Sequence, residues 1–376
     1  MGTCKFCGKT DVFVSKVLEI CRDCILSRDR KEVERYVLGV HEQVRKTEKL
    51  PGYVPKVDKS ERRLACYICI NECSLGEDDM SYCGLRKVAS KNLKFPSKKI
   101  SYMHGYLDLN PTNCCNSWFC PAGTTSGYPK YSDFNGVERG TYSYAAFMYG
   151  CSFDCLFCQN ASHKRFSSYN IKERDFYVNE IVKNEKITCV CYFGGTPDCQ
   201  LPFTIKASET ILERIKETNP KRKMRICWES NGSGNQKMWE RCMQIAIKSG
   251  GNIKFDLKTY NEILNLALCG ITNKQTYNNF KFLTKKYFGT RLDVPEMSGC
   301  TLLVPGYTTA KEVEKIAQFI ASINKDIPYS LLVFHGDYMM RDLPITPKKQ
   351  AYECLDVARE HLNRVRLGNE FLLKFH

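Results

Sequence analysis

From about residue 140 onward, short apolar runs alternate with amphipathic stretches. The apolar runs predict strands at 141–150, 187–195, 224–231, 252–258, 301–306 and 329–334. The amphipathic stretches predict helices at 173–184, 206–217, 236–250, 309–323 and 346–361. Strands that are separated by helices pair in parallel, and near-continuous apolar strands need cover on both faces. We therefore expect an α/β fold, either a barrel or an open doubly wound sheet.

Length and composition indicate a globular chain without a membrane segment. The 376 residues, of which 43% are hydrophobic, suffice for a full core and for two or three domains. No apolar run approaches the roughly 18 to 20 residues of a membrane span, and the N-terminus lacks the apolar region of a secretory signal. We expect a cytoplasmic protein with no membrane partner. The formal net charge of +15 favours a solvated basic surface over a nucleic-acid face.

Cysteines are frequent, and many of the 22 are separated by only two or three residues. In a reducing compartment such spacing predicts metal ligands rather than disulfides. The first two pairs have the spacing of a zinc ribbon, a closed site whose ligands would be Cys4, Cys7, Cys21 and Cys24. A charged helix is predicted from Arg28 to about Lys49. A linker is predicted at 52–63, where Gly52 and Pro55 break any helix.

A second group of cysteines precedes the strand–helix alternation. It comprises Cys66, Cys69, Cys73 and Cys83, followed by Cys114, Cys115 and Cys120. Seven thiols exceed what one zinc ion needs, so this segment predicts at least one auxiliary metal centre, either zinc or iron–sulfur. Adjacent side chains diverge, which leaves open whether both Cys114 and Cys115 are ligands. We expect the segment to fold back as a lid near the mouth of a barrel.

The stretch GCSFDCLFCQN places Cys151, Cys155 and Cys158 in a tight loop after the first predicted strand. In a parallel barrel, functional groups gather in the loops that follow the strands. Three thiolates can hold three irons of a cubane cluster and leave the fourth iron open for a small molecule. No glycine-rich phosphate loop follows the first strand, so a dinucleotide or P-loop function loses its main support.

The stretch CSFDCLFC resembles the C-x3-C-x-aromatic-C signature of the radical S-adenosylmethionine (SAM) superfamily, with Phe157 at the aromatic position. The resemblance implies a 4Fe-4S cluster that reduces bound SAM and yields a 5′-deoxyadenosyl radical. It also implies SAM-binding roles for residues after the next three strands, namely Gly194 and Gly195 in FGGTPD, Ser230 and Asn231 in WESNG, and Asp256 and Lys258 in FDLK. Alternate strand residues share a face, so Asp256 and Lys258 are expected to point together.

Within the superfamily, residues 64–370 resemble the branch of pyruvate formate-lyase activating enzyme relatives and AmmeMemoRadiSam proteins. The resemblance rests on CYICINECSLGEDDMSYCGLR, CQN, FDLK and LLVPGY, and it implies a partial (β/α)6 TIM-like barrel. The expected domains are a zinc ribbon (1–30), a basic helical segment and linker (31–63), a Cys-rich auxiliary metal-binding segment (64–139), the partial barrel (140–345) and a C-terminal helical extension (346–376).

The leading functional hypothesis is a radical SAM enzyme that modifies a protein or peptide, in the manner of a glycyl-radical activase. An electron donor such as ferredoxin or flavodoxin would be its partner. One alternative is a cobalamin-dependent protein C-methyltransferase of the methanogen type, although the sequence has no Asp-x-His-x-x-Gly cobalamin loop. An RNA-modifying radical SAM enzyme is a second alternative, motivated by the ribbon and the basic charge. A non-catalytic metal-binding scaffold is a third.

Eight further cysteines lie in or beside predicted strands and helices. They are Cys189, Cys191, Cys199, Cys227, Cys242, Cys269, Cys300 and Cys354. Free cysteine is among the most buried residue types, so small apolar core positions are expected for most of them. Cys199 is the exception, because it lies just after the Gly-Gly turn and close to the expected SAM site.

Overall fold

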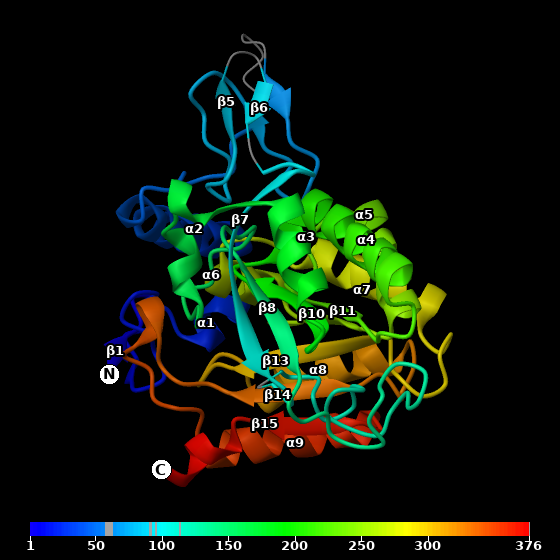
Figure 1. Ribbon diagram of the computed structural model, residues 1–376. Helices are drawn as coiled ribbons and strands as arrows, with labels where there is room; N and C mark the ends of the chain where they lie inside the picture. The colour runs from blue at the N-terminus through cyan, green and yellow to red at the C-terminus, as the bar shows by residue number, and fades with distance from the viewer. Residues whose placement is uncertain (57–62, 90–91, 95, 113, 376) are drawn as a thin grey trace.

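A nine-stranded sheet forms the centre of the computed structural model, which describes residues 1–56, 63–89, 92–94, 96–112 and 114–375 (Figure 1). The strand order is β15-β14-β13-β12-β11-β10-β8-β7-β9. Seven strands pair in parallel: β8 (Tyr142–Met148), β10 (Ile187–Gly194), β11 (Arg225–Ser230), β12 (Ile253–Asp256), β13 (Met297–Leu303), β14 (Tyr329–Val333) and β15 (Val365–Gly368). The mostly parallel α/β fold is therefore confirmed, and the six predicted strands are present.

Two antiparallel strands extend the sheet beyond the predicted alternation. β7 (Ile100–Leu109) pairs with β8, and the short β9 (Ile171–Glu173) pairs with the outer edge of β7. The sheet ends at β15 on one side and at β9 on the other, and these two edges do not pair within the described residues. The strands thus form an open, curved sheet.

Helices cover the outer face of the sheet (Figure 1). They are α3 (Arg174–Lys183), α4 (Leu201–Thr218), α5 (Gln236–Ser249), α7 (Lys274–Tyr287), α8 (Ala310–Ala321) and α9 (Lys348–His361). Each buries an apolar stripe, such as Phe203, Ala207 and Ile211 of α4, against the strands. Such stripes at spacings of three and four residues stabilise the helices mainly through tertiary packing. α6 (Glu262–Cys269) and α7 were not expected from the sequence.

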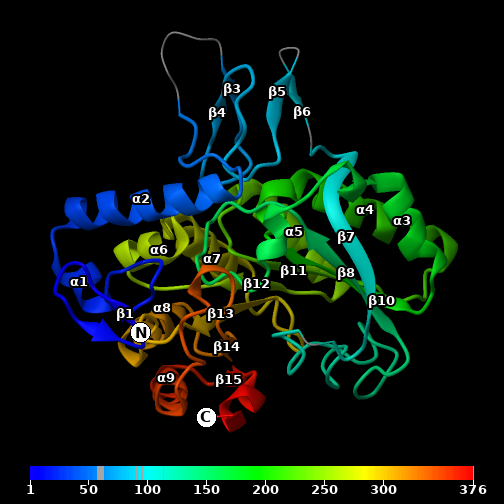
Figure 2. The same cartoon turned by 90° about the vertical axis from the view of Figure 1, so that its left-hand side faces the viewer.

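The N-terminal part of the chain packs on one flank of the sheet (Figure 2). β1 (Gly2–Thr3), β2 (Thr10–Asp11) and α1 (Arg22–Ser27) form the ribbon, and α2 (Arg30–Thr47) leads away from it. The Asp29 side chain caps α2 by accepting a hydrogen bond from the backbone N–H of Glu32, at 3.0 Å. Residues 57–62 of the predicted linker lie outside the described residues.

Two small hairpins follow α2 and project from the body of the molecule (Figures 1 and 2). They are formed by β3 (Leu64–Ala65) with β4 (Ser74–Leu75) and by β5 (Lys87–Ala89) with β6 (Asn92–Lys94). The described residues also contain five 3-10 helices: η1 (Ala161–Lys164), η2 (Ser168–Asn170), η3 (Pro197–Gln200), η4 (Tyr338–Met340) and η5 (Glu370–Phe375). None of the described helices combines the length and apolar character that crossing a bilayer requires.

Candidate functional site

A cavity of about 540 Å³ lies at the carboxyl ends of the parallel strands. Its walls include the loop after β8, the last residues of β10, and inward-facing side chains of β11, β12 and β13. Successive side chains of a strand point to opposite faces, so every second residue of these strands faces the cavity. The position agrees with the general rule that parallel α/β folds carry their sites where the strands end.

Cys151, Cys155 and Cys158 all line this cavity from the loop after β8. The backbone N–H of Phe153 donates to Sγ of Cys151 at 3.4 Å, and the Asn231 side-chain amide lies 3.6 Å from the same atom. Burial raises the pKa of Cys151 well above its usual value and that of Cys158 to about 12. Neutral thiols are therefore favoured until a cation stabilises the thiolates, as bound metal does.

A fourth cysteine lies beside this loop. The Cys269 thiol, at the end of α6, hydrogen-bonds to Cys155 and thereby lowers the pKa of Cys155. The loop itself is fixed to α6, because the backbone N–H groups of Asp154 and Leu156 donate to the carbonyls of Cys269 and Leu268, at 2.8 and 3.0 Å. The sequence had indicated a core position for Cys269, and the side chain is indeed fully buried.

The Gly-Gly turn at the end of β10 lies against the cysteine loop. A side chain on Gly195 would meet the carbonyl oxygen of Gly150 at 2.4 Å and the ring of His163 at 2.7 Å. Gly194 has a φ of +111°, in the region that glycine tolerates best, and its carbonyl accepts a hydrogen bond from the Asn160 side chain at 3.3 Å. Both positions therefore require glycine, and both line the cavity.

Two buried polar atoms on the cavity wall have no hydrogen-bond partner among the described residues. They are Nδ1 of His163 and Nε2 of Gln159. Burial lowers the pKa of His163 to about 3, so its ring is neutral at physiological pH. A buried polar atom without a partner is costly, and such atoms mark places where a bound ligand completes the hydrogen bonding.

Ser230, the last residue of β11, and Asn231, which follows it, point in different directions. Asn231 lines the cavity, and its amide donates to the Ser152 hydroxyl at 2.9 Å. Ser230 is not among the lining residues, and its hydroxyl instead donates to the buried Asp198 carboxylate. The alternation of side chains along the strand explains this difference, because it directs Glu229 and not Ser230 into the cavity.

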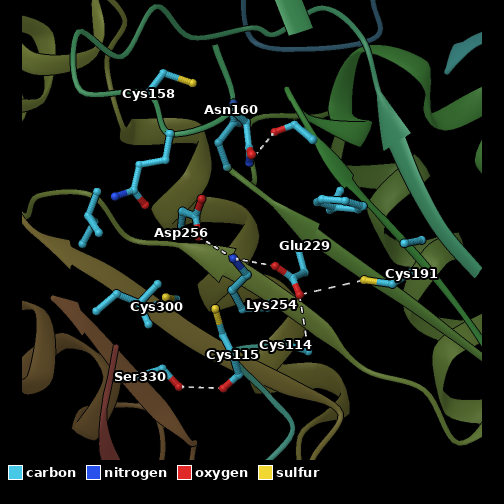
Figure 3. Close-up of a pocket in the computed structure, with 18 of the residues that line it drawn as sticks. Cys114, Cys115, Cys158, Asn160, Cys191, Glu229, Lys254, Asp256, Cys300 and Ser330 are labelled. Carbon is cyan, nitrogen blue, oxygen red and sulfur yellow. Dashed lines mark hydrogen bonds and ion pairs between the residues drawn. The ribbon is translucent and has the colours of Figure 1, made fainter. Parts of the chain in front are cut away.

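A row of four charged side chains crosses the cavity wall, and Figure 3 labels three of them, Asp256, Lys254 and Glu229. Lys258 pairs with Asp256 at 2.8 Å, which confirms that these two residues point together. Asp256 also pairs with Lys254 at 2.8 Å, and Lys254 pairs with Glu229 at 3.1 Å. Phe157 lies at the start of the row, with its ring centroid 5.9 Å from Nζ of Lys258. The sequence analysis did not indicate Lys254 or Glu229 as site residues. The available signal was that Lys254 alternates along the strand with Asp256 and Lys258 and therefore shares their face.

The cavity wall opposite the cysteine loop carries further thiols (Figure 3). Cys114 lies 3.2 Å from Oε1 of Glu229, and Cys191 lies 3.9 Å from the same oxygen. Cys115 hydrogen-bonds to the Cys300 thiol. Cys191 and Cys300 were expected in the apolar core, but they line the cavity. In an open sheet, side chains on the inner face can border a cavity instead of packing against other side chains.

The seven cysteines of the auxiliary segment therefore do not gather at one place. Cys114, Cys115 and Cys120 belong to the loop that packs against the lower part of the sheet, where they line two neighbouring cavities. Cys66, Cys69, Cys73 and Cys83 lie in the hairpin region, and Cys83 packs in one buried cluster with Cys199 from the body of the molecule.

The ribbon cysteines form a compact group. The Sγ atoms of Cys4, Cys7, Cys21 and Cys24 all lie within 4.8 Å of one another. Tetrahedral zinc with bonds of about 2.3 Å separates its sulfur ligands by about 3.8 Å, which is the separation of Cys7 and Cys21. The predicted ligand set is thus assembled with the geometry that a closed zinc site needs.

Asp154, a residue of the cysteine loop, anchors this loop to other parts of the fold through its buried carboxylate. Asp154 is fully buried and contacts His41 at 2.8 Å, Arg45 at 3.5 Å and the ammonium group of Lys164. His41 and Arg45 come from α2, whereas Lys164 comes from η1. α2, far from the strands in sequence, thus helps to fix the loop that carries Cys151, Cys155 and Cys158.

A three-thiol loop and a Gly-Gly turn at the mouth of a parallel α/β sheet define a cluster-binding class of enzyme. Residues 146–320 match the model of the radical SAM superfamily, and this part of the chain is a radical SAM domain. The family implies a 4Fe-4S cluster and SAM as cofactors. The chain is thus a radical SAM enzyme.

Three known proteins illustrate the similarity. A Methanocaldococcus jannaschii protein named "Putative glycyl-radical enzyme activating enzyme" is 26% identical over 229 residues, which are 59% of this chain and 79% of the relative. A domain of pyruvate-formate lyase-activating enzyme from Bacteroides vulgatus is 14% identical and covers 48% of this chain and 98% of its own, with a TM-score of 0.35. SuiB of Streptococcus suis is 15% identical and covers 60% of this chain and 49% of its own, with a TM-score of 0.44.

Proposed function

We propose that Cys151, Cys155 and Cys158 hold the 4Fe-4S cluster, and that SAM binds beside them in the cavity. When bound, the cluster supplies the electron that splits SAM into methionine and a 5′-deoxyadenosyl radical. The observation that carries this proposal is the convergence of three thiols on a cavity that also contains unpartnered polar atoms. A donor such as ferredoxin or flavodoxin would deliver the electron.

The wall of the cavity suits a polar, zwitterionic ligand. His163 and Gln159 offer buried polar atoms without partners, and Asn231 offers an amide next to Cys151. The turn at Gly194 and Gly195 lies directly against Gly150 and Met148 because neither glycine has a side chain, and both glycines line the cavity. Phe157 and Lys258 would lie along the same ligand. All of the expected SAM-binding residues except Ser230 line this one cavity.

The charged row would orient the substrate. Lys258, Asp256, Lys254 and Glu229 form two cations and two carboxylates in alternation, so the row is balanced before any ligand binds. Burial raises the pKa of Asp256, but Lys254 and Lys258 outweigh burial and hold that pKa below its usual value. The carboxylate therefore stays ionised and can accept hydrogen bonds at a fixed position in the cavity.

The substrate that we propose is a protein or a peptide, with a glycyl-radical enzyme as one form. The sheet does not close between β15 and β9 within the described residues, and Arg366, Gly368 and Asn369 at the β15 end line the cavity. An opening beside an edge strand admits a chain segment that a closed barrel would exclude. The name of the M. jannaschii relative supports the same class of substrate.

Cluster chemistry is tested by reconstituting the protein anaerobically with iron and sulfide and measuring 5′-deoxyadenosine after reduction. Replacing Cys151, Cys155 and Cys158 together by Ala should abolish its formation. Replacing Cys242 and Cys354, which are buried in the main core away from the cavity, should leave it unchanged. Formation of 5′-deoxyadenosine by the triple variant at the parent rate would contradict the ligand assignment.

Substrate class is tested with an extract from cells grown in deuterated medium and separated by size. Hydrogen abstraction transfers deuterium to 5′-deoxyadenosine, which mass spectrometry detects. We expect transfer from the macromolecular fraction and its loss after protease treatment. Transfer that survives protease but not ribonuclease would favour the RNA alternative, and transfer from small molecules alone would contradict both. Corrinoid absorbance in the purified protein would instead favour the cobalamin-dependent methyltransferase.

A further inference from the structure

Five buried thiols meet where the hairpin region contacts the body of the molecule. Four are Cys66, Cys69, Cys73 and Cys83, and the fifth is Cys199 of η3. Cys83 and Cys199 pack together in one small buried cluster with Leu85. The backbone N–H of Tyr82 donates to Sγ of Cys73 at 3.4 Å, and the Ser81 hydroxyl lies 3.3 Å from Sγ of Cys83. Donors to sulfur of this kind commonly surround thiolate ligands.

A buried guanidinium accompanies these thiols. The side chain of Arg86 donates to the Cys199 carbonyl at 2.7 Å and lies 4.0 Å from Sγ of Cys83, and the residue is 5% exposed. The carbonyl of Cys199 and the sulfur of Cys83 are thus its polar neighbours, and none of the ion pairs among the described residues includes Arg86. A buried cation is stable only beside negative charge.

Neutral thiols cannot supply that negative charge, whereas a thiolate-bound metal can. Four thiolates around one Zn²⁺, or around a cubane of charge 2+, leave a net charge of about −2. Five thiols packed around a guanidinium are difficult to explain as apolar core. They are readily explained as ligands and neighbours of an anionic metal centre.

The same cysteines contact three of the loops around the cavity, in part through their backbones. Cys199 lies four residues after Gly195 and joins the hairpin region to the Gly-Gly turn. Cys69 forms a β-bridge with Gly234 after β11. A side chain on Gly150, before Cys151, would meet the Cys83 carbonyl at 2.9 Å. The hairpin region therefore packs against these loops without lining the cavity, whereas Cys114 and Cys115 of the expected lid do line it.

We propose that Cys66, Cys69, Cys73 and Cys83, together with Cys199 from the body of the molecule, form one thiolate metal site that fastens the hairpin region to the three loops. Arg86 is the counter-charge of this site. The sequence indicated four of these cysteines as ligands, but Cys199 and Arg86 become visible only in the fold.

The spacing of the thiols favours an iron–sulfur cluster over a single zinc ion. The only group of three or more potential ligands that lies within 4.8 Å throughout, in the described part of the chain, is that of the ribbon. Sulfur ligands of one zinc ion would have to be that close, whereas ligands of a cubane bind different irons and lie farther apart.

The test uses full-length protein in which Cys151, Cys155 and Cys158 are replaced by Ala, so that the proposed SAM cluster cannot contribute. Iron, sulfide and zinc are counted after anaerobic reconstitution. We expect metal in excess of the one zinc ion expected in the ribbon, and we expect Cys83→Ala and Cys199→Ala each to lower this excess relative to Cys242→Ala. Iron with sulfide would identify a cluster, and a second equivalent of zinc would identify a zinc site. Cys242→Ala, a buried cysteine in the main core, serves as the matched control.

The proposal is overturned if the excess metal is absent, or if Cys199→Ala retains as much as Cys242→Ala does. If Cys199→Ala fails to fold, Cys199→Ser preserves size and offers a weaker ligand. A shifted electron paramagnetic resonance spectrum or a lower metal content than in Cys242→Ser is then expected, and an unchanged spectrum and content would overturn the role of Cys199. Because these measurements need no SAM cleavage, their failure is distinct from failure of the proposed function.

Discussion

The side-chain amide nitrogen of Asn231 lies 3.6 Å from Sγ of Cys151, across the gap between the loop after β11 and the loop after β8. The same amide donates to the Ser152 hydroxyl at 2.9 Å, which fixes its orientation. One residue thereby contacts a proposed cluster ligand and also lines the cavity in which SAM would bind.

Asn231→Ala should lower the reduction potential of the reconstituted cluster. Hydrogen bonds to ligand sulfur stabilise the electron-rich reduced state, so their loss makes reduction harder. A hydrogen bond to a charged group contributes about 1.5 kcal/mol, which for one electron corresponds to at most about 60 mV. Redox titration followed by electron paramagnetic resonance measures the shift. Asn116→Ala, which removes a buried asparagine bonded to Asn252, is the control, and an equal shift in both variants would contradict a specific role for Asn231.

Asp154→Ala should destabilise the fold strongly. The substitution leaves the buried charges of Arg45 and Lys164 without their carboxylate, and removal of one partner from a buried ion pair typically costs about 3–5 kcal/mol. Denaturant unfolding measures the loss. Asp175→Ala removes an ion-paired carboxylate with a side chain that is 77% exposed, and we expect less than about 1 kcal/mol for it. Similar losses in the two variants would show that the network beneath the cysteine loop contributes little.

A second buried ion pair predicts a pH dependence. Arg225 of β11 binds both carboxylate oxygens of Glu138, at 2.8 and 2.6 Å, and both side chains are almost fully buried. Burial raises the pKa of Glu138, but the charge and hydrogen bonds of Arg225 outweigh burial, so the pKa lies below its usual value. A lowered pKa in the folded state contributes stability that is present above the unfolded value of about 4.3 and is lost as the pH falls through the folded value.

Glu138→Gln should therefore unfold more easily than the parent protein at pH 7, and the difference should narrow at acidic pH. Denaturant midpoints at pH 7 and between about pH 3 and 5 measure this trend. Glu185→Gln, at a residue exposed on the surface, provides the comparison. A difference between Glu138→Gln and the parent that stays constant over the whole pH range would contradict the lowered pKa.

Removal of zinc from the ribbon should be detectable in the intact chain. Cys7 is the exposed member of the four ligands, so Cys7→Ser should release one equivalent of zinc and lower the thermal midpoint. The ribbon rests on the body of the molecule, because the Tyr307 hydroxyl accepts from the N–H of Ser15 and donates to the Ile20 carbonyl. Metal analysis and thermal unfolding measure the two effects. Thr10→Ala, in the same ribbon, should keep its zinc.

The parallel strands could be predicted well from the sequence because buried parallel strands consist of nearly continuous apolar runs. The sequence did not indicate β7, whose residues alternate between buried and exposed over only part of its length. α6 and α7 were missed as well. α7 reads KQTYNNFKFLTKKY, in which buried Thr276 and Asn279 occupy positions that usually carry apolar residues.

The site was predicted unevenly for a physical reason. The three-cysteine loop is a local signal, and its residues are close in sequence as well as in space. Cys199, Arg86, Lys254 and Glu229 acquire their meaning only from neighbours on other strands and loops. A buried Cys and a cavity-facing Cys have the same identity in the sequence, which is why Cys191 was expected in the core.

Helix α2 sets the distance between the ribbon and the cysteine loop. Its 18 residues span about 27 Å, from the cap beside the ribbon to Arg45 beneath the cysteine loop. Inserting one residue before His41 would rotate the following side chains by about 100° and turn His41 and Arg45 away from Asp154. Inserting seven residues would nearly restore the angle but would lengthen the helix by about 10 Å. The ribbon would then no longer reach its contact with Tyr307. Neither the phase nor the length of α2 can therefore change alone, so alterations of chain length in this region should be confined to segments outside the helix.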